Sequence, residues 1–273
     1  MRTVDYDELD KWGPWVGDAI TKRAITKRAG RRLIQELSRS APEYIEDARD
    51  WLYNRLGGKY VVDAVSRDLN FSHVRLFHGT RLTDAELDQV RREGLKPLRL
   101  ADRMPHIADV FQTHPRWGEV KAGLAEAVQA FGPGAEAGLR EDGCVHFCFS
   151  RSSLLLGCSH YLTHGAEVDN HIGYRLFGDH SASRLLRENR KPYLISCDVP
   201  FEVAAQGSHA LGELEGGRTI LTNMLVGAWA YRQAHESFRV TTQMDCSAAK
   251  IKGVIPPDRL KFEAVDDAHL AED

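Results

Sequence analysis

A His-Gly-Thr step at residues 78–80 brings an imidazole, a hydroxyl and several backbone hydrogen-bonding groups to one point of the chain. The apolar residues from Val74 onward predict a short strand that ends at this step. Together these groups can bind a flat ligand that carries an amide. The competing interpretation is an ordinary strand-to-helix turn in which the histidine is hydrogen-bonded and structural.

A second candidate stretch, Gly143 to Tyr161, has the sequence GCVHFCFSRSSLLLGCSHY. Its apolar residues alternate with His146 and Cys148, as in a strand whose two faces differ. Serines follow, Ser150 first, and their hydroxyls can cap a helix that leads to Tyr161. The tyrosine ring can stack on a flat cationic ring. A partly buried helical tyrosine is an equally good interpretation.

The elements that must position these groups follow from the surrounding sequence. Thr83 and Glu86 form a capping box, which predicts a helix over residues 84–93 that Gly94 ends. Further helices are predicted at residues 119–130, 152–162, 167–177, 181–189 and 219–234. Strands are predicted at residues 74–78, 144–149, 193–199, 237–243, 248–254 and 259–264.

The first 70 or so residues are predicted to be helical. Ser40 and Glu43 form a second capping box before a helix over residues 41–56, which Gly57 ends. The lysines and arginines between residues 22 and 32 favour a solvated helix face over contact with phosphates. Helices that precede a mixed sheet are typical of the α+β class.

The two candidate stretches resemble the ADP-ribosyltransferases with a His-Tyr-Glu signature, the group of diphtheria toxin and the poly(ADP-ribose) polymerases. The resemblance covers residues 74–264 in outline, and it is specific over residues 74–97 and 143–161. It implies a mixed, mainly antiparallel split sheet with flanking helices, and the predicted N-terminal helical unit precedes the part of the chain that it covers.

The resemblance also implies NAD as co-substrate. His78 would contact the ribose, the Gly79 backbone would hold the nicotinamide carboxamide, and Tyr161 would stack on the nicotinamide ring. The other residues expected to bind NAD are Thr80, Arg81 and Ser150.

Breaking the bond between ribose and nicotinamide calls for a carboxylate that stabilises the cationic sugar. In the family this residue lies near the start of a late strand, where this chain has Gln243 and Asp245 but no glutamate. Glu167 is the first candidate, with His171 one helical turn further on. The other candidates are Asp245 and a pair that resembles a loop motif of the Arg-Ser-Glu branch, Glu213 and Glu215.

Length and composition limit the remaining possibilities. The 273 residues allow one large domain or a core with a smaller unit. The sequence patterns predict a helical region over 1–72 and an acidic tail over 266–273, and the resemblance implies an ADP-ribosyltransferase-like catalytic domain over 73–265. A net charge of −3 exerts no global pull on nucleic acid or membranes. No apolar run approaches the ~20 residues of a membrane span. The five cysteines include no C-x-x-C pair, so reduced thiols and a cytoplasmic location are expected.

Other chemistries lack their motifs, since no Walker A loop, H-E-x-x-H or G-x-S-x-G is present. No metal is expected, because the histidines and cysteines near residues 146–164 are irregularly spaced. The resemblance implies a transferase that modifies a protein or nucleic acid, as a bacterial toxin or anti-phage effector with an inhibitory antitoxin protein. A non-catalytic module that binds NAD or ADP-ribose and an NAD glycohydrolase are the alternatives.

Overall fold

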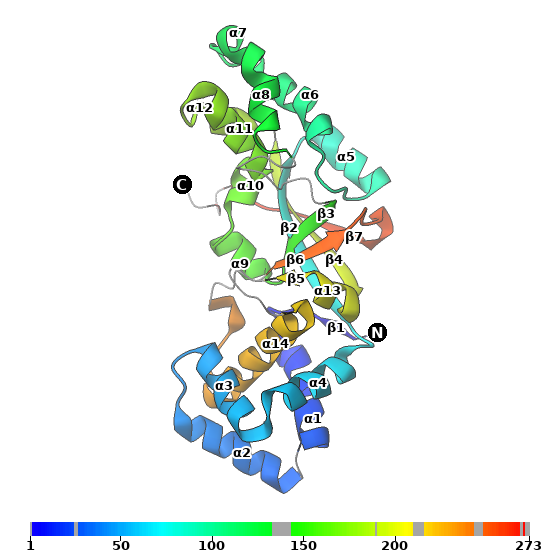
Figure 1. Ribbon diagram of the computed structural model, residues 1–273, viewed down its shortest axis with the longest axis vertical. Coiled ribbons are helices and arrows are strands. Elements are labelled where there is room, and N and C mark those ends of the chain that lie inside the picture. The colour runs from blue at the N-terminus through cyan, green and yellow to red at the C-terminus, as the bar shows by residue number, and fades with distance from the viewer. Residues whose placement is uncertain are drawn as a thin grey trace. The chain divides into compact units, whose positions relative to one another are not determined.

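A computed structural model describes residues 2–24, 27–132, 143–188, 190–209, 216–242, 248–267 and 270 of the chain (Figure 1). Helices alternate along the chain with the strands of one open, largely antiparallel sheet, which confirms the predicted α+β class. The chain divides into two compact units.

The described strands form one open sheet in the order β5-β6-β3-β2-β4-β7, with β1 paired to β2. Their bounds are β1 Thr3–Val4, β2 His73–Leu82, β3 Cys144–Cys148, β4 Lys191–Pro200, β5 Ser208–His209, β6 Ala248–Lys252 and β7 Leu260–Ala264. β4 pairs antiparallel with β7 and β5 with β6, whereas β1 runs parallel to β2. The strand that carries the His-Gly-Thr step is therefore an inner strand of the sheet.

Five of the six predicted strands overlap strands of the structure, and the one predicted over residues 237–243 is wrong. Val240–Thr242 form a 3-10 turn there. The backbone N–H of Phe238 donates to the His235 carbonyl at 2.9 Å, so the chain turns before it could extend. The side chains of Phe238 and Val240 are both buried, which explains the apolar pattern without a strand.

The first unit comprises Met1–Leu76, Cys148–Ser153 and Asp198–Lys250. Its helices are α1 Leu9–Ala24, α2 Lys27–Ser40, α3 Ile45–Leu56, α4 Gly58–Leu69, α13 Phe201–Gly207 and α14 Gly217–Ala234. The late helix α14 packs against all five of the others, and Figure 1 shows it in gold among the blue and cyan helices. The predicted boundary at residue 72 differs from this division because the central part of α14 is apolar and buried.

Two predicted helix boundaries in the early and middle chain are wrong. The capping box of Ser40 and Glu43 does not form, because α2 runs through Ser40 and α3 begins only at Ile45. The backbone N–H of Tyr44 donates instead to the carboxylate of Asp47 at 3.0 Å. The predicted helix over residues 152–162 is two short helices, α9 Arg151–Leu156 and α10 His160–His164.

The second unit comprises Phe77–Phe147, Leu154–Cys197 and Ile251–Asp273. Its helices are α5 Asp84–Glu93, α6 Leu100–Phe111, α7 Trp117–Val120, α8 Leu124–Gln129, α10, α11 Glu167–Phe177 and α12 Ser181–Arg187. An apolar cluster joins α6, α8, α11 and α12 around Ile107, Phe111 and Ile172, each fully buried.

The bounds of α5 and α11 match the predicted ranges. The predicted capping box of α5 is confirmed, since the Glu86 carboxylate accepts from the Thr83 backbone N–H at 2.8 Å and the Thr83 hydroxyl accepts from Glu86 N–H at 3.2 Å. Gly94 ends the helix with a φ of 84°, a left-handed value that suits glycine.

Candidate functional site

His78 is half-buried on β2, and its ring is held from two sides. Nδ1 lies 2.8 Å from the backbone oxygen of His146, and the ring meets Phe147 edge to face at 5.8 Å between centroids. Because a carbonyl oxygen only accepts, Nδ1 must carry the proton and donate it. Burial lowers the pKa of His78, which favours the neutral ring. Nε2 therefore keeps its lone pair and can accept a hydrogen bond.

Gly79 lies directly against the helix that carries Tyr161. A Cβ atom built on Gly79 would stand 3.2 Å from the Cβ of Tyr161 and 3.2 Å from Cδ1 of Leu154. Any side chain at this position would require Tyr161 and Leu154 to shift by a few tenths of an ångström. Tyr161 itself is half-buried in α10. The structure thus brings two of the predicted site residues together from distant parts of the sequence.

Successive residues of β2 face opposite sides of the sheet. The burial pattern at this end of the strand alternates, with His78 and Thr80 partly exposed and Gly79 and Arg81 buried. Thr80 thus shares a face with His78, while Arg81 shares the face on which Tyr161 lies.

Arg81 was expected to bind NAD, but its guanidinium is already surrounded by acceptors of the protein. The two Nη atoms donate to the carboxylate of Asp267 at 2.6 and 2.8 Å. The same group donates to the carbonyls of Leu162 at 3.1 Å and Arg187 at 3.3 Å. With 4% of its surface exposed, Arg81 acts here as an internal connector rather than an open cation.

Glu167 begins α11, as predicted, and its carboxylate lies 3.7 Å from Nε2 of His171 one turn further on. The chain reaches this helix through Gly165, which has a φ of 82° and packs on Arg81. The loop before Glu167 is therefore anchored two residues along β2 from Gly79.

Ser150 belongs to the first unit, whereas the other predicted site residues that the structure describes belong to the second. Its hydroxyl donates to Asp7 at 2.6 Å and accepts from the backbone N–H of Ser153 at 2.9 Å. These contacts make it a structural cap at the start of α9. The remaining candidates, Glu213, Glu215, Gln243 and Asp245, lie outside the described residues.

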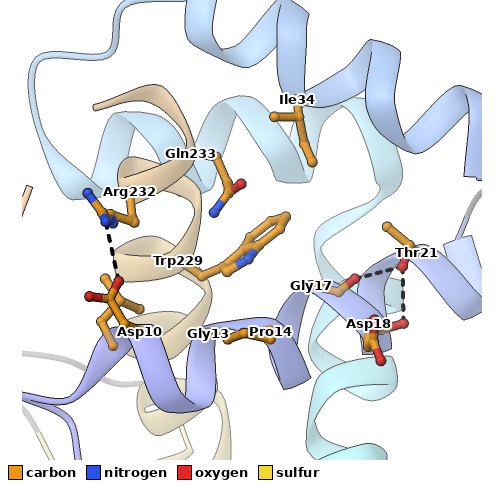
Figure 2. Close-up of a pocket in the computed structure, with 11 residues that line it drawn as sticks. Asp10, Gly13, Pro14, Gly17, Asp18, Thr21, Ile34, Trp229, Arg232 and Gln233 are labelled. Carbon is orange, nitrogen blue, oxygen red and sulfur yellow. Dashed lines mark hydrogen bonds and ion pairs between the residues drawn. The ribbon is translucent and has the colours of Figure 1, made fainter. Parts of the chain in front are cut away.

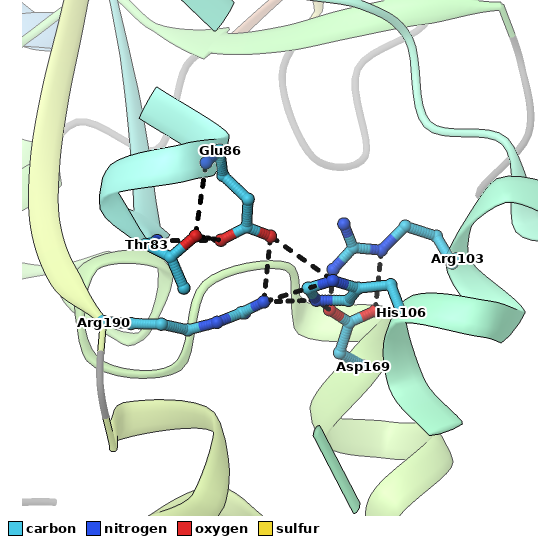
Figure 3. Close-up of polar contacts among 6 residues, drawn as sticks. All are labelled: Thr83, Glu86, Arg103, His106, Asp169 and Arg190. Atoms are coloured by element: carbon cyan, nitrogen blue, oxygen red, sulfur yellow. Dashed lines mark hydrogen bonds and ion pairs between the residues drawn. The ribbon is translucent and has the colours of Figure 1, made fainter. Parts of the chain in front are cut away.

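A buried cluster of charged groups lies in the second unit and was not predicted from the sequence (Figure 3). Asp169, which is fully buried, accepts from Arg103 Nε at 3.1 Å. Arg190 donates to Glu86 at 3.0 Å. The carboxylates thus each take one arginine, and the cluster ties together α5, α6, α11 and the entry to β4. Its signal in the sequence is weak, an aspartate beside Val168 within an apolar helical pattern.

His106 lies between the two arginines of this cluster (Figure 3). Its Nδ1 stands 3.3 Å from Glu86, and an N–H of Arg190 points at its Nε2. Nε2 must accept, so Nδ1 carries the proton and faces the carboxylate. Burial first, and then the charges of Arg103 and Arg190, lower the pKa of His106 to about 4. The ring is neutral at physiological pH.

The first unit holds a separate cavity of about 390 Å³ between α1, α2 and α14 (Figure 2). The indole of Trp229 lies along α1, where a Cβ atom on Gly17 would stand 3.0 Å from its nitrogen. Arg232 pairs with Asp10 at 3.3 Å on the same wall. None of the residues predicted to bind NAD lines this cavity.

The described part of the chain lacks two features that define other protein classes. No helix there is long and apolar enough to cross a membrane. No group of three or more His, Cys, Asp or Glu side chains among those residues could hold a metal ion.

Comparison with known proteins finds no match among protein-family models, curated proteins or solved structures. The functional assignment therefore rests on the residues of the site and their geometry.

Proposed function

We propose that this chain is an NAD-dependent ADP-ribosyltransferase. The observation that carries the proposal is the contact between Gly79 and Tyr161, with the neutral His78 next in the chain. These three residues were selected from sequence for three parts of one ligand. Gly79 and Tyr161 are in contact within one unit, which supports the nicotinamide part of the proposal, whereas His78 faces the other side of β2.

The contacts of each residue support its proposed part in binding. Nε2 of His78 can accept a hydrogen from a ribose hydroxyl, because Nδ1 is occupied by the His146 carbonyl. The peptide groups of Gly79 can take the carboxamide, and the ring of Tyr161 can cover the nicotinamide.

The proposed reaction breaks the bond between C1′ of the ribose and the nicotinamide nitrogen. Nicotinamide leaves with the bonding electron pair, and an acceptor atom bonds to C1′ and loses its proton. Glu167 is the proposed carboxylate that stabilises the cationic sugar. A protein or nucleic-acid acceptor, a role as toxin or anti-phage effector and an inhibitory partner rest on the sequence resemblance alone.

The second candidate function is an NAD- or ADP-ribose-binding module without chemistry. The sequence favours it, because the late segment that would carry the family's glutamate has only Gln243 and Asp245. An NAD glycohydrolase is the third candidate, with water in place of the acceptor.

Labelled NAD tests these proposals. Purified protein is incubated with NAD and cell lysate, and both free nicotinamide and label on macromolecules are measured. The transferase releases nicotinamide and labels protein or nucleic acid, and nuclease or protease digestion identifies which. Nicotinamide release without label indicates the glycohydrolase. Binding of NAD without release indicates the binding module.

Matched variants assign the residues. His78→Ala and Tyr161→Ala should abolish transfer, whereas His180→Ala and Tyr174→Ala, at exposed positions of the same unit, should not. Glu167→Gln should abolish transfer but keep NAD binding, and the exposed Glu126→Gln should match the wild type. Transfer that survives Glu167→Gln removes the proposed role of Glu167. Absence of NAD binding by the wild type overturns the proposed function.

A further inference from the structure

The guanidinium of Arg81 donates hydrogen bonds to carbonyls at the C-terminal ends of two helices beside the proposed NAD site. One of its carbonyl acceptors, Leu162, lies in the last turn of α10, and the other, Arg187, is the last residue of α12. The final carbonyls of a helix lack partners within the helix and carry its negative partial charge. A buried cation at this point satisfies both.

The position of Arg81 links its hydrogen bonds to the two helix ends with the proposed nicotinamide-binding residues Gly79 and Tyr161. Arg81 is two residues beyond Gly79 on the same face of β2, and Leu162 directly follows Tyr161. The strand and α10 are therefore joined twice, by packing at Gly79 and Tyr161 and by hydrogen bonding at Arg81 and Leu162. The second join lies one residue along α10 from Tyr161.

The counter-charge of Arg81 comes from the end of the chain. Asp267 accepts from both Nη atoms in a two-pronged pair, the geometry that a guanidinium forms best with a carboxylate. Arg81 lowers the pKa of Asp267, so the carboxylate stays ionised at neutral pH. Leu270 is buried and its N–H donates to the Asp267 carbonyl at 3.1 Å. This part of the predicted acidic tail is anchored in the second unit.

We propose that Arg81 is a positioning residue that holds Tyr161 against Gly79, and that Asp267 is the counter-charge it requires. Asp267, near the C-terminus, then helps to position the proposed nicotinamide-binding residues. This inference rests on the proposed function and replaces the expectation that Arg81 contacts NAD directly.

Calorimetric titration with NAD and with ADP-ribose tests the inference. ADP-ribose lacks nicotinamide, so the position of Tyr161 affects the affinity for NAD alone. Arg81→Lys keeps the charge but loses the planar fork. It should raise the Kd for NAD about tenfold, as expected for loss of a charged hydrogen bond. The Kd for ADP-ribose should change by less than about twofold.

Three further variants sharpen the test. Asp267→Asn should show the same selective loss in weaker form, and it provides the comparison if Arg81→Lys does not fold. Arg92→Lys, at an exposed position of α5, should match the wild type. The double variant Arg81→Lys/Tyr161→Ala should bind NAD no more weakly than Tyr161→Ala, because both changes remove one interaction.

The outcomes separate the two proposals. Equal losses of NAD and ADP-ribose binding would show a merely structural role for Arg81 and overturn the inference, as would unchanged NAD binding in both Arg81→Lys and Asp267→Asn. Additive losses in the double variant would also overturn it. A wild type that binds neither ligand overturns the proposed function and the inference with it.

Discussion

Two histidines of the second unit are kept neutral by burial, and the hydrogen-bonding partner of each determines which nitrogen carries the proton. His78 donates from Nδ1 to a carbonyl, whereas His106 accepts at Nε2 from Arg190. Burial lowers the pKa of both rings. The two neutral rings have different roles. His78 is half-exposed beside the proposed ligand site, whereas His106 is part of a buried charge cluster.

Acid should destabilise the protein through His106. Its pKa falls from 6.5 to about 4 on folding, so the unfolded chain takes up the proton first as the pH decreases. Stability is then full above pH 6.5 and declines as the pH falls towards 4, by up to about 3 kcal/mol. Urea unfolding across this range measures the effect. His106→Gln should flatten the profile and His180→Gln should not. An unchanged profile in His106→Gln would contradict the assignment.

Removal of the buried carboxylate of Asp169 should be costly. Asp169→Asn leaves Arg103 buried without its counter-charge, and loss of one partner of a buried ion pair costs about 3–5 kcal/mol. Urea unfolding at neutral pH measures the loss. Asp102→Asn, at an exposed position of α6, should change stability by no more than about 0.5 kcal/mol. Similar stabilities for the two variants would show that the cluster contributes little.

At the scale of elements, β2 and α10 approach each other closely at Gly79, where an added Cβ would be tightly packed against Tyr161 and Leu154. The capped start of α5 follows on the same strand and takes part in the charge cluster through Glu86. Two residues of β2, Gly79 and Arg81, therefore make the contacts described above. Glu86 of the helix that follows the strand makes the third set of contacts, in the charge cluster.

A methyl group at Gly79 should force this contact apart. The added Cβ would stand 3.2 Å from Tyr161 Cβ and from Leu154 Cδ1, so Gly79→Ala should destabilise the fold by about 1–3 kcal/mol. It should also weaken NAD binding more than ADP-ribose binding. Gly118→Ala is the matched control, since a Cβ there meets nothing within 4 Å. Thermal unfolding and the two titrations measure both effects. If Gly79→Ala and Gly118→Ala had the same stability and the same affinities, the contact between β2 and α10 would accommodate a methyl group without cost.

At the scale of the whole molecule, two units share one chain that passes between them several times. The first unit takes α14 from late in the sequence and joins it to the N-terminal helices. The second is built on the apolar cluster around Phe111. Each unit has its own core, so local damage should stay within one of them.

Hydrogen exchange distinguishes this division from a boundary at residue 72. A Cβ on Gly227 of α14 would stand 2.7 Å from Ile45 Cγ2, so Gly227→Val should loosen α1–α4 together with α14. Phe111→Ala opens the other core, at a cost of about 3–5 kcal/mol, and should speed exchange in α6, α8, α11 and α12. Faster exchange in α6 and α11 on Gly227→Val, with α1–α4 unchanged, would support the sequence-based boundary instead.

Local hydrogen-bonding patterns could be read directly from the sequence. The bounds of α5 and α11 were predicted, as was the Thr83–Glu86 box, because each depends on residues three or four positions apart. The strand around His78 followed from its apolar run. The same local rule failed at Ser40, where the preceding helix continues through the predicted cap and the alternative cap lies four residues further on.

Only the tertiary structure decided which distant groups meet. The sequence by itself determined the α+β class, the helix caps and the choice of His78, Gly79 and Tyr161 as candidates. It did not show that Arg81 faces Asp267 or that Asp169 faces Arg103, because a charged side chain carries no local mark of its partner. Nor did it show that α14 belongs with the first helices. Helix caps depend on neighbours within one turn, whereas buried pairs and helix packing depend on how the whole chain folds.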